Sequence, residues 1–181
     1  QSIGNLGLDA GGKLLAPLVK DKNEWVRSEV VKALTNIESE PAVRALCKAL
    51  LDAKALIART AADALVAVAE GPYSQRIPDD EIEKGLDARD ADVRAKVVWI
   101  LRQRVERPIS LLTRLALDPN PAIHTPALDE IFNRISARDI KHVERLIKAK
   151  NVNVRFAATQ IIGEIPGRRA DKALLALLED K

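Results

Sequence analysis

The 181-residue sequence predicts an all-α fold, an α-solenoid in which about five helical hairpins stack as a right-handed superhelix. Three observations carry this prediction. Alanine and leucine dominate a sequence whose aromatic content is only 3%, and such residues favour helix. Apolar residues recur at helical spacing, and a similar segment returns about every 31 residues, which is the sequence pattern of repeat architectures. No segment shows the short alternating runs that strands need.

Composition and charge favour a packed soluble domain over a nucleic-acid-binding or membrane-spanning protein. The chain is 47% hydrophobic and 30% charged, which is typical of a packed soluble domain. It carries 29 basic and 26 acidic residues mixed along its length. A nucleic-acid surface usually concentrates lysine and arginine on one face or in one run, so this pattern makes nucleic-acid binding the less favoured interpretation. No stretch approaches 18 apolar residues, so no membrane span or membrane partner is expected.

A single cysteine, Cys47, lies on an apolar helix face and is expected to be buried filler. A lone cysteine cannot form an intrachain disulfide, and no signal peptide is evident. We therefore expect a reducing, cytoplasmic setting.

A repeated segment defines the internal organisation. We call its first buried position the anchor; in the five copies the anchors are Val26, Ile57, Val93, Ile123 and Val154. The spacings between anchors are 31, 36, 30 and 31 residues. The longer interval contains residues 70–80, "EGPYSQRIPDD", whose Gly, Pro and Asp residues indicate an inserted loop.

Each anchor is predicted to open a helix, called helix B. Apolar residues then follow four, five, seven and eight positions later, on one helical face; in the first copy the face includes Val26, Val30, Ala33 and Leu34. Three residues before the anchors stand Asn23, Lys54, Asp90, Asn120 and Asn151. Four of these five residue types are good N-caps, because their side chains accept a hydrogen bond from the first turn.

A second apolar-periodic segment, helix A, precedes each helix B. The predicted units cover residues 8–37, 40–69, 78–105, 107–135 and 137–165, with partial helices at 1–7 and 168–181. Stacked pairs bury a continuous core that one pair cannot bury alone. We therefore predict a single repeat domain over residues 1–181, monomeric or part of a larger chain, and either cut from a longer array or closed by an improvised cap.

The repeat resembles a known family. An Asp at the end of helix A, an Asn or Asp cap, and the pattern V-R-x-x-A-A-x-A-L resemble the short HEAT-like repeats of the phycobilin-lyase type. "NEWVRSEVVKAL" and "NVNVRFAATQIIGEI" match best, whereas Trp99, His124 and Glu130 depart from the pattern. The resemblance implies a solenoid of HEAT-like hairpins. The family includes lyase subunits that hold bilins, iron-dependent hydroxylases, DNA glycosylase relatives and scaffolds, so it selects no one chemistry.

Residues for catalysis or metal binding are not evident in the sequence. The iron hydroxylases need paired His-Glu steps, but the two histidines, His124 and His142, are not followed by Glu. Residues 9–13, "DAGGK", lack the spacing of a phosphate-binding loop and are interpreted as a turn leading into helix A. We predict no catalytic residue, no cofactor and no metal, and therefore no enzyme.

One position on helix B departs from its column in the repeat alignment. Trp99 replaces residues that are polar in the other four copies, Lys32, Asp63, Asp129 and Gln160. Aromatic and arginine side chains with a polar rim are typical of protein-binding hot spots. The candidate partner-binding residues are Trp99, Arg102, Gln103, Asp129, Phe132 and Asn133.

The sequence thus predicts a non-catalytic scaffold that binds another protein on the concave surface of its B helices. Two alternatives stay open: a nucleic-acid-binding relative of DNA glycosylases without an evident catalytic site, and a lyase-type subunit that holds a bilin. A purely structural reading also stays open, in which Trp99 and Phe132 fill space between helices.

The column after the anchor is mostly cationic, reading Arg27, Ala58, Arg94, His124 and Arg155. The turns before helix B carry Asp21, Asp52 and Asp118. Because the cations repeat in register with the turn carboxylates, we predict a structural ladder made of Arg27, Arg94, Arg155, Asp21, Asp52 and Asp118 that ties repeats together. Two other aromatic residues are expected to pack, Trp25 in a turn between helices A and B and Phe156 between repeats.

Overall fold

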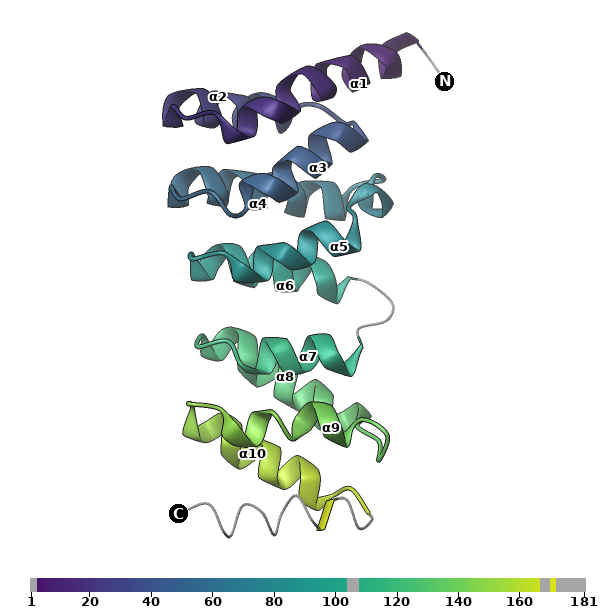
Figure 1. Cartoon of the computed structure of the whole chain (residues 1–181). Coiled ribbons are helices and arrows are strands. Elements are labelled where there is room, and N and C mark those ends of the chain that lie inside the picture. The colour runs from purple at the N-terminus through teal and green to yellow at the C-terminus, as the bar shows by residue number, and fades with distance from the viewer. Residues whose placement is uncertain (1–2, 104–107, 167–169, 172–181) are drawn as a thin grey trace. The chain divides into compact units, whose positions relative to one another are not determined.

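The computed structural model describes residues 3–103, 108–166 and 170–171 (Figure 1). Every regular element in these residues is a helix, which confirms the predicted all-α class. The chain forms two compact units, Gln1–Val105 and Glu106–Lys181. In each unit helical hairpins pack one upon the next, as in an α-solenoid.

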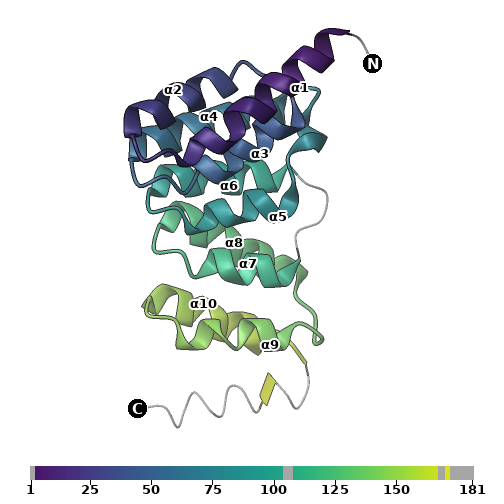
Figure 2. The ribbon, with the colours of Figure 1, turned by 45° about the horizontal axis from the view of Figure 1, so that its top comes forward.

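The first unit contains three hairpins. Their A helices are α1 (Ile3–Leu15) continued by the 3-10 helix η1 (Ala16–Lys20), α3 (Glu40–Ala49), and α5 (Asp79–Ile82) continued by the 3-10 helix η3 (Glu83–Asp87). Their B helices are α2 (Glu24–Leu34), α4 (Ala55–Glu70) and α6 (Ala91–Arg102), and a short 3-10 helix, η2 (Ser74–Arg76), lies in the inserted loop. α3 packs between α1 and α5, and α4 packs between α2 and α6, so the A helices and the B helices form two layers (Figure 2).

The second unit contains two described hairpins. The first pairs α7 (Ile109–Ala116) with α8 (Pro121–Arg134). The second pairs α9 (Ile140–Val143) and the 3-10 helix η4 (Leu146–Lys148) with α10 (Val152–Gly163). Pro121 occupies the first turn of α8, where its missing N–H would have had no helical partner.

The core of each unit lies between its two helix layers. The anchors Ile57, Val93, Ile123 and Val154 are buried, as the periodicity predicts. Two predictions for the first copy are wrong: Val26 is only half-buried and Ala33 is exposed. α2 is the first helix B of its unit, so no earlier helix B among the described residues covers that side of it.

The predicted turn at residues 9–13 is also wrong, because α1 runs unbroken from Ile3 to Leu15. The helix therefore joins the predicted partial helix at 1–7 to the first repeat. A Cβ at Gly12 would contact Ser39 Oγ and lie 3.1 Å from Ala42 N, so this glycine lets α1 approach the start of α3. The predicted partial helix at 168–181 lies, apart from residues 170–171, outside the described residues.

Candidate functional site

The turns between helices A and B share one contact, made by the residue that follows the anchor. In four of the five repeats this side chain lies within hydrogen-bond distance of the backbone oxygen six residues earlier: Arg27 Nη1 to Asp21 O at 2.9 Å, Arg94 Nη1 to Ala88 O at 2.9 Å, His124 Nδ1 to Asp118 O at 2.9 Å, and Arg155 Nη1 to Ala149 O at 2.7 Å. The carbonyl groups at the end of helix A lack helical donors, and these side chains supply one.

His124, which departs from the family pattern, occupies the same place as the arginines. It is buried, and its Nδ1 faces a carbonyl oxygen, which can only accept a hydrogen bond. The contact therefore requires that Nδ1 carry a proton. Ala58 is the one member of the column that has no polar side chain for this role.

Carboxylates also stabilise three of the turns between helices A and B. In Asp21, Asp52 and Asp118 the Oδ1 atom accepts a hydrogen bond from the backbone N–H two residues later, at 2.8, 2.9 and 2.8 Å. Short polar side chains commonly stabilise turns in this way. The predicted N-caps follow: Asn23, Asp90, Asn120 and Asn151 each accept a hydrogen bond from the first turn of a helix B.

Arg27 also contacts the next repeat. Its Nε lies 2.6 Å from Asp52 Oδ2 and its Nη2 lies 3.1 Å from Asp52 Oδ1, so the guanidinium binds the carboxylate with two parallel hydrogen bonds. The side chains are only 15% and 4% exposed. Burial alone would raise the pKa of Asp52, but the hydrogen bonds from Arg27 and from the Lys54 N–H outweigh it and lower the pKa of this carboxyl.

The second junction of the first unit uses different positions. Arg59, one residue beyond the column, donates to Asp90 Oδ2 from Nε at 3.0 Å and from Nη2 at 2.7 Å. This hydrogen bond from Arg59 lowers the pKa of Asp90. This pair was not predicted from the sequence. The repeat alignment does contain a signal for it, because Ala58 and Ala88 leave both ladder positions without a charged side chain and Arg59 and Asp90 lie one and two residues away.

The six residues predicted as a ladder are thus distributed over the two units. Asp21, Arg27, Asp52 and Arg94 belong to the first unit, while Asp118 and Arg155 belong to the second. Arg27 and Asp52 meet directly, and Arg94 and Arg155 bind the carbonyl oxygens of their own turns. That the whole set ties the array together stays a prediction.

The candidate partner-binding residues are also divided between the units. Trp99 lies on α6 and is 36% exposed. Arg102 and Gln103, three and four residues later, are exposed on the same side of the helix. In the second unit Asp129, Phe132 and Asn133 are exposed on and around one turn of α8, where Asn133 Nδ2 donates to Asp129 O at 2.9 Å.

Two aromatic residues that are predicted to pack are exposed instead, so these predictions are wrong. Trp25, in the first turn of α2, is 75% exposed, and Phe156 on α10 is also exposed. Each lies at a position of helix B that the periodicity does not direct into the core. They offer matched comparisons for Trp99 and Phe132, because they are exposed residues of the same type in the same unit.

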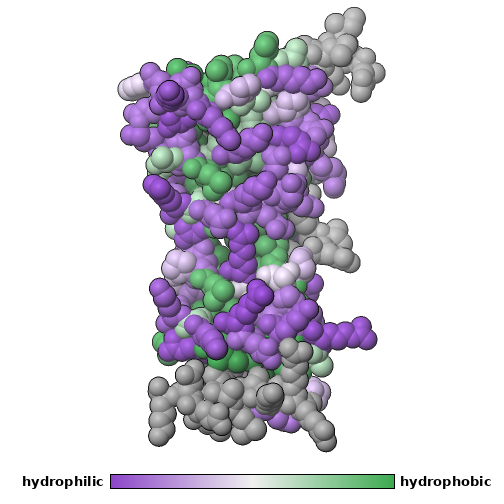
Figure 3. Space-filling view, viewed as in Figure 1, coloured by the Kyte–Doolittle hydropathy of each residue, from purple (hydrophilic) through white to green (hydrophobic). Residues whose placement is uncertain are grey.

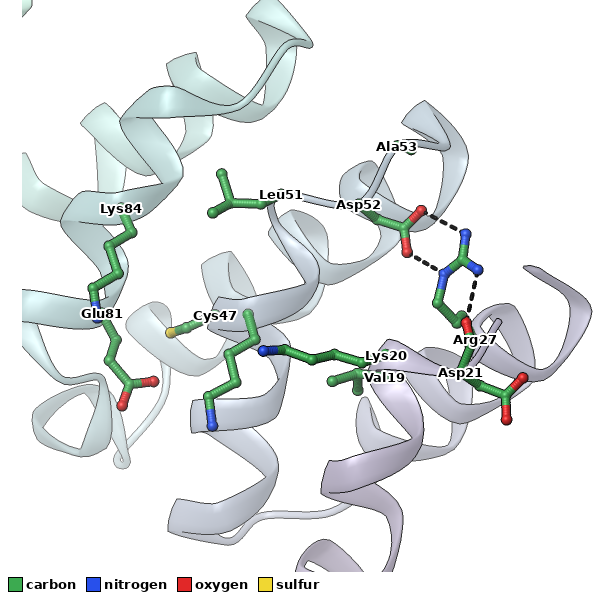
Figure 4. A pocket seen from close by; sticks show the side chains of 11 residues that line it. Val19, Lys20, Asp21, Arg27, Cys47, Leu51, Asp52, Ala53, Glu81 and Lys84 are labelled. Atoms are coloured by element: carbon green, nitrogen blue, oxygen red, sulfur yellow. Dashed lines mark hydrogen bonds and ion pairs between the residues drawn. The ribbon is translucent and has the colours of Figure 1, made fainter. Parts of the chain in front are cut away.

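A hollow of about 670 Å³ opens on the A-helix layer of the first unit (Figure 4). Val19 and Lys20 form one wall, and Glu81 and Lys84 form the opposite wall. Cys47 lies between the walls and is buried, as the sequence predicts. The Arg27–Asp52 pair closes one end of the hollow (Figure 4).

The described part of the chain contains no group of three or more His, Cys, Asp and Glu side chains that could hold a metal ion. No described helix combines the length and the apolar character needed to cross a bilayer.

The stacked hairpins define a helical repeat protein, and comparison with known proteins narrows the class. Residues 1–66 match the family model for HEAT repeats, which agrees with the HEAT-like repeat pattern in the sequence. No curated protein matches the chain. HEAT repeats typically serve as scaffolds for protein interactions.

Two engineered proteins with crystal structures from the Northeast Structural Genomics Consortium are similar to the chain, each at 19% sequence identity. The first aligns over 96% of this chain and 54% of its own length with a TM-score of 0.46. The second aligns over 92% of this chain and 67% of its own length with a TM-score of 0.36. The chain therefore spans about half the length of the first.

Proposed function

We propose that this protein is a non-catalytic scaffold that binds another protein through the exposed surface of its B helices. The observation that carries the proposal is the partial exposure of Trp99 at a helix-B position where Lys32 and Asp63 stand in the preceding repeats. A large aromatic residue in contact with solvent at a polar position has no evident role in stacking the repeats. Tryptophan and arginine are the residues most enriched at energetically dominant interface positions.

The neighbours of Trp99 support the same interpretation. Arg102 and Gln103 are exposed one helical turn away, so a partner could contact an aromatic ring together with a cation and an amide. In the second unit Phe132 is exposed beside Asn133 and can extend the contact surface of that unit independently. The match of residues 1–66 to HEAT repeats agrees with a scaffold.

The test uses a partner captured from native lysate, identified by mass spectrometry and then purified. Trp99→Ala and Phe132→Ala are titrated against it beside Trp25→Ala and Phe156→Ala, which remove exposed aromatic residues elsewhere in the same units. We expect Trp99→Ala to raise the Kd by about tenfold or more, as for a dominant interface residue. We expect Trp25→Ala to leave the Kd unchanged.

Equal affinities for Trp99→Ala and Trp25→Ala, with both proteins folded, would refute the proposal. Retention of duplex DNA or RNA, with an affinity that falls steeply between two salt concentrations, would favour nucleic-acid binding instead. A visible absorbance band in the purified protein would favour a bilin-holding subunit.

A further inference from the structure

The hollow on the A-helix layer continues into a second one. This second hollow, of about 680 Å³, lies against α1, η1 and α3 and shares Val19, Lys20 and Lys48 with the first. Both hollows lie within the first unit. Together they form one trough, which we call the lysine groove because Lys20, Lys48 and Lys84 line it.

The lysines of the groove are available to bind an anion. Lys20, Lys48 and Lys84 are exposed and make no ion pair or side-chain hydrogen bond within the described residues. Lys48 and Lys84 occupy the same position of helix A, nine residues before the anchor, so successive repeats present them in register. Figure 4 shows Lys20 reaching into the hollow from the wall opposite Lys84.

Two of the three carboxylates of the first hollow bind arginines. Asp52 binds Arg27, and Glu81 Oε1 accepts a hydrogen bond from Arg44 Nη1 at 2.7 Å. The other oxygen of Glu81, Oε2, is buried and has no hydrogen-bond partner within the described residues. Asp21 accepts a hydrogen bond from the Asn23 N–H at 2.8 Å.

The second hollow adds Asp9, Lys13, Glu40 and Arg44 to the lining, and Glu40 is paired with Arg44. Lys20, Lys48 and Lys84 form no ion pair with these carboxylates, and an anionic ligand complements the three lysines.

Apolar residues supply the rest of the lining. Val19 and Cys47 are buried in the first hollow, whereas Leu51 lines it and is 48% exposed. An exposed leucine among lysines fits a ligand that carries both acidic and apolar groups. A nucleic acid fits less well, because the lining contains no aromatic side chain on which a base could stack.

We propose that the lysine groove binds an acidic peptide segment of a partner protein, with apolar side chains of the peptide against Leu51 and carboxylates against Lys20, Lys48 and Lys84. This site lies on the A helices and is independent of Trp99 and of the function proposed for the B helices.

The probe is a fluorescent ten-residue peptide of alternating Glu and Leu, titrated against the full chain and followed by anisotropy. The groove variant carries Lys20→Gln, Lys48→Gln and Lys84→Gln. The control variant carries Lys141→Gln, Lys148→Gln and Lys150→Gln, which remove the same charge from exposed lysines of the second unit. Circular dichroism of both variants establishes that they remain folded.

We expect the groove variant to raise the Kd for the peptide about tenfold, because each exposed charge pair contributes only a fraction of that change. The control variant should change the Kd less than twofold, within the range expected when general electrostatic attraction alone is reduced. Leu51→Gln should also weaken binding, and a Gln/Leu peptide should bind at least tenfold less tightly than the Glu/Leu peptide.

Three outcomes would overturn the proposal: no saturable binding of the Glu/Leu peptide, equal losses in the groove and control variants, or displacement of the peptide by a ten-nucleotide single strand that binds more tightly. A Trp99→Ala chain should bind the peptide normally. Failure of the peptide test therefore leaves the helix-B proposal untouched, and the reverse also holds.

Discussion

The two junctions of the first unit join successive repeats with the same chemistry at different positions. At the first junction Arg27, one residue after the anchor, binds Asp52 in the turn of the next repeat. At the second, Arg59 lies two residues after the anchor and binds Asp90, the N-cap of the next helix B. The first pair is 15% and 4% exposed, whereas the second is 52% and 13% exposed.

The difference shows that an arginine and a carboxylate can join two repeats from more than one pair of positions relative to the anchor. The more exposed pair contributes less, because water screens its attraction and competes for its hydrogen bonds. The first junction has a further exposed ion pair, in which Lys54 Nζ lies 2.6 Å from Glu24 Oε2. The second junction has one in which Lys96 Nζ lies 2.7 Å from Asp63 Oδ1. It also brings Gly85 of η3 close to Leu50 and Val97. The first junction thus contains one well-buried ion pair, whereas the cations in the ion pairs of the second junction, Arg44, Arg59 and Lys96, are more exposed than Arg27.

The largest effect is expected at the buried pair. Arg27→Ala should lower the free energy of unfolding by about 2–3 kcal/mol, because it removes charge-assisted hydrogen bonds and leaves the Asp52 carboxylate without its cation. Chemical denaturation measures this change. Arg27→Lys is the control that keeps the charge but loses the paired hydrogen-bond geometry. Its free energy of unfolding should lie between those of the natural chain and Arg27→Ala. A loss in partner affinity without a loss in stability would contradict the structural role.

Packing at the second junction is tested by Gly85→Ala. A Cβ at this position would lie 2.7 Å from Leu50 Cδ1 and 2.7 Å from Val97 Cγ2, so these side chains must shift. We expect a loss of about 1–2 kcal/mol in the free energy of unfolding, typical of overpacking. In a Val97→Ala background, Gly85→Ala should cost less than it does in the natural chain, because the truncated side chain leaves space for the new methyl group. No change in the thermal midpoint of Gly85→Ala would show that the junction is less tightly packed than the structure indicates.

Acid should weaken the first junction. The pKa of Asp52 is lowered from its ordinary value of 3.8, so the folded state binds fewer protons than the unfolded state. The stabilisation is therefore fully present above 3.8 and is lost as the pH falls through the lowered pKa. The stability difference between the natural chain and Asp52→Asn should be constant near neutral pH and shrink in this acidic window. A difference that does not change with pH would exclude ionisation of Asp52 as the source.

The smallest effect is expected at the exposed pair. Arg59→Ala should lower the thermal midpoint by less than Arg27→Ala, and the difference from the natural chain should shrink as salt is added. Parallel melting curves at low and high salt measure both features. An Arg59→Ala loss equal to that of Arg27→Ala would remove the distinction between the buried and the exposed junction.

Much of the fold could be predicted because it depends on local residue patterns. Anchors at helical spacing and caps such as Asn120 and Asn151 define where each helix B begins, and both are short-range features. The turn at residues 9–13 was mispredicted because Gly11 and Gly12 resemble a turn sequence, while their place in α1 is set by the approach of α3. The burial of Ala33 was mispredicted because periodicity assigns a face to every helix, whether or not a neighbour covers it.

The candidate sites likewise combine features that the sequence predicts with features that depend on tertiary packing. Trp99 and the cationic column could be recognised from the sequence, because aligning the five repeats reveals both a residue that departs from its column and a residue type that recurs in one. The pairing of Arg59 with Asp90, which are 31 residues apart, depends on how one hairpin stacks on the next. The lysine groove likewise combines Lys20, Lys48 and Lys84 from three successive A helices.

The sequence by itself determined the all-helical fold class, the start of each helix B and the cationic column after the anchors. These properties depend on propensities and contacts within a few residues. The tertiary structure alone decided which arginine meets which carboxylate, which apolar side chains stay exposed and where the lysines gather. These depend on the stacking of hairpins about 30 residues apart, where a shift of one position changes the partner, as the change from Arg27 to Arg59 demonstrates.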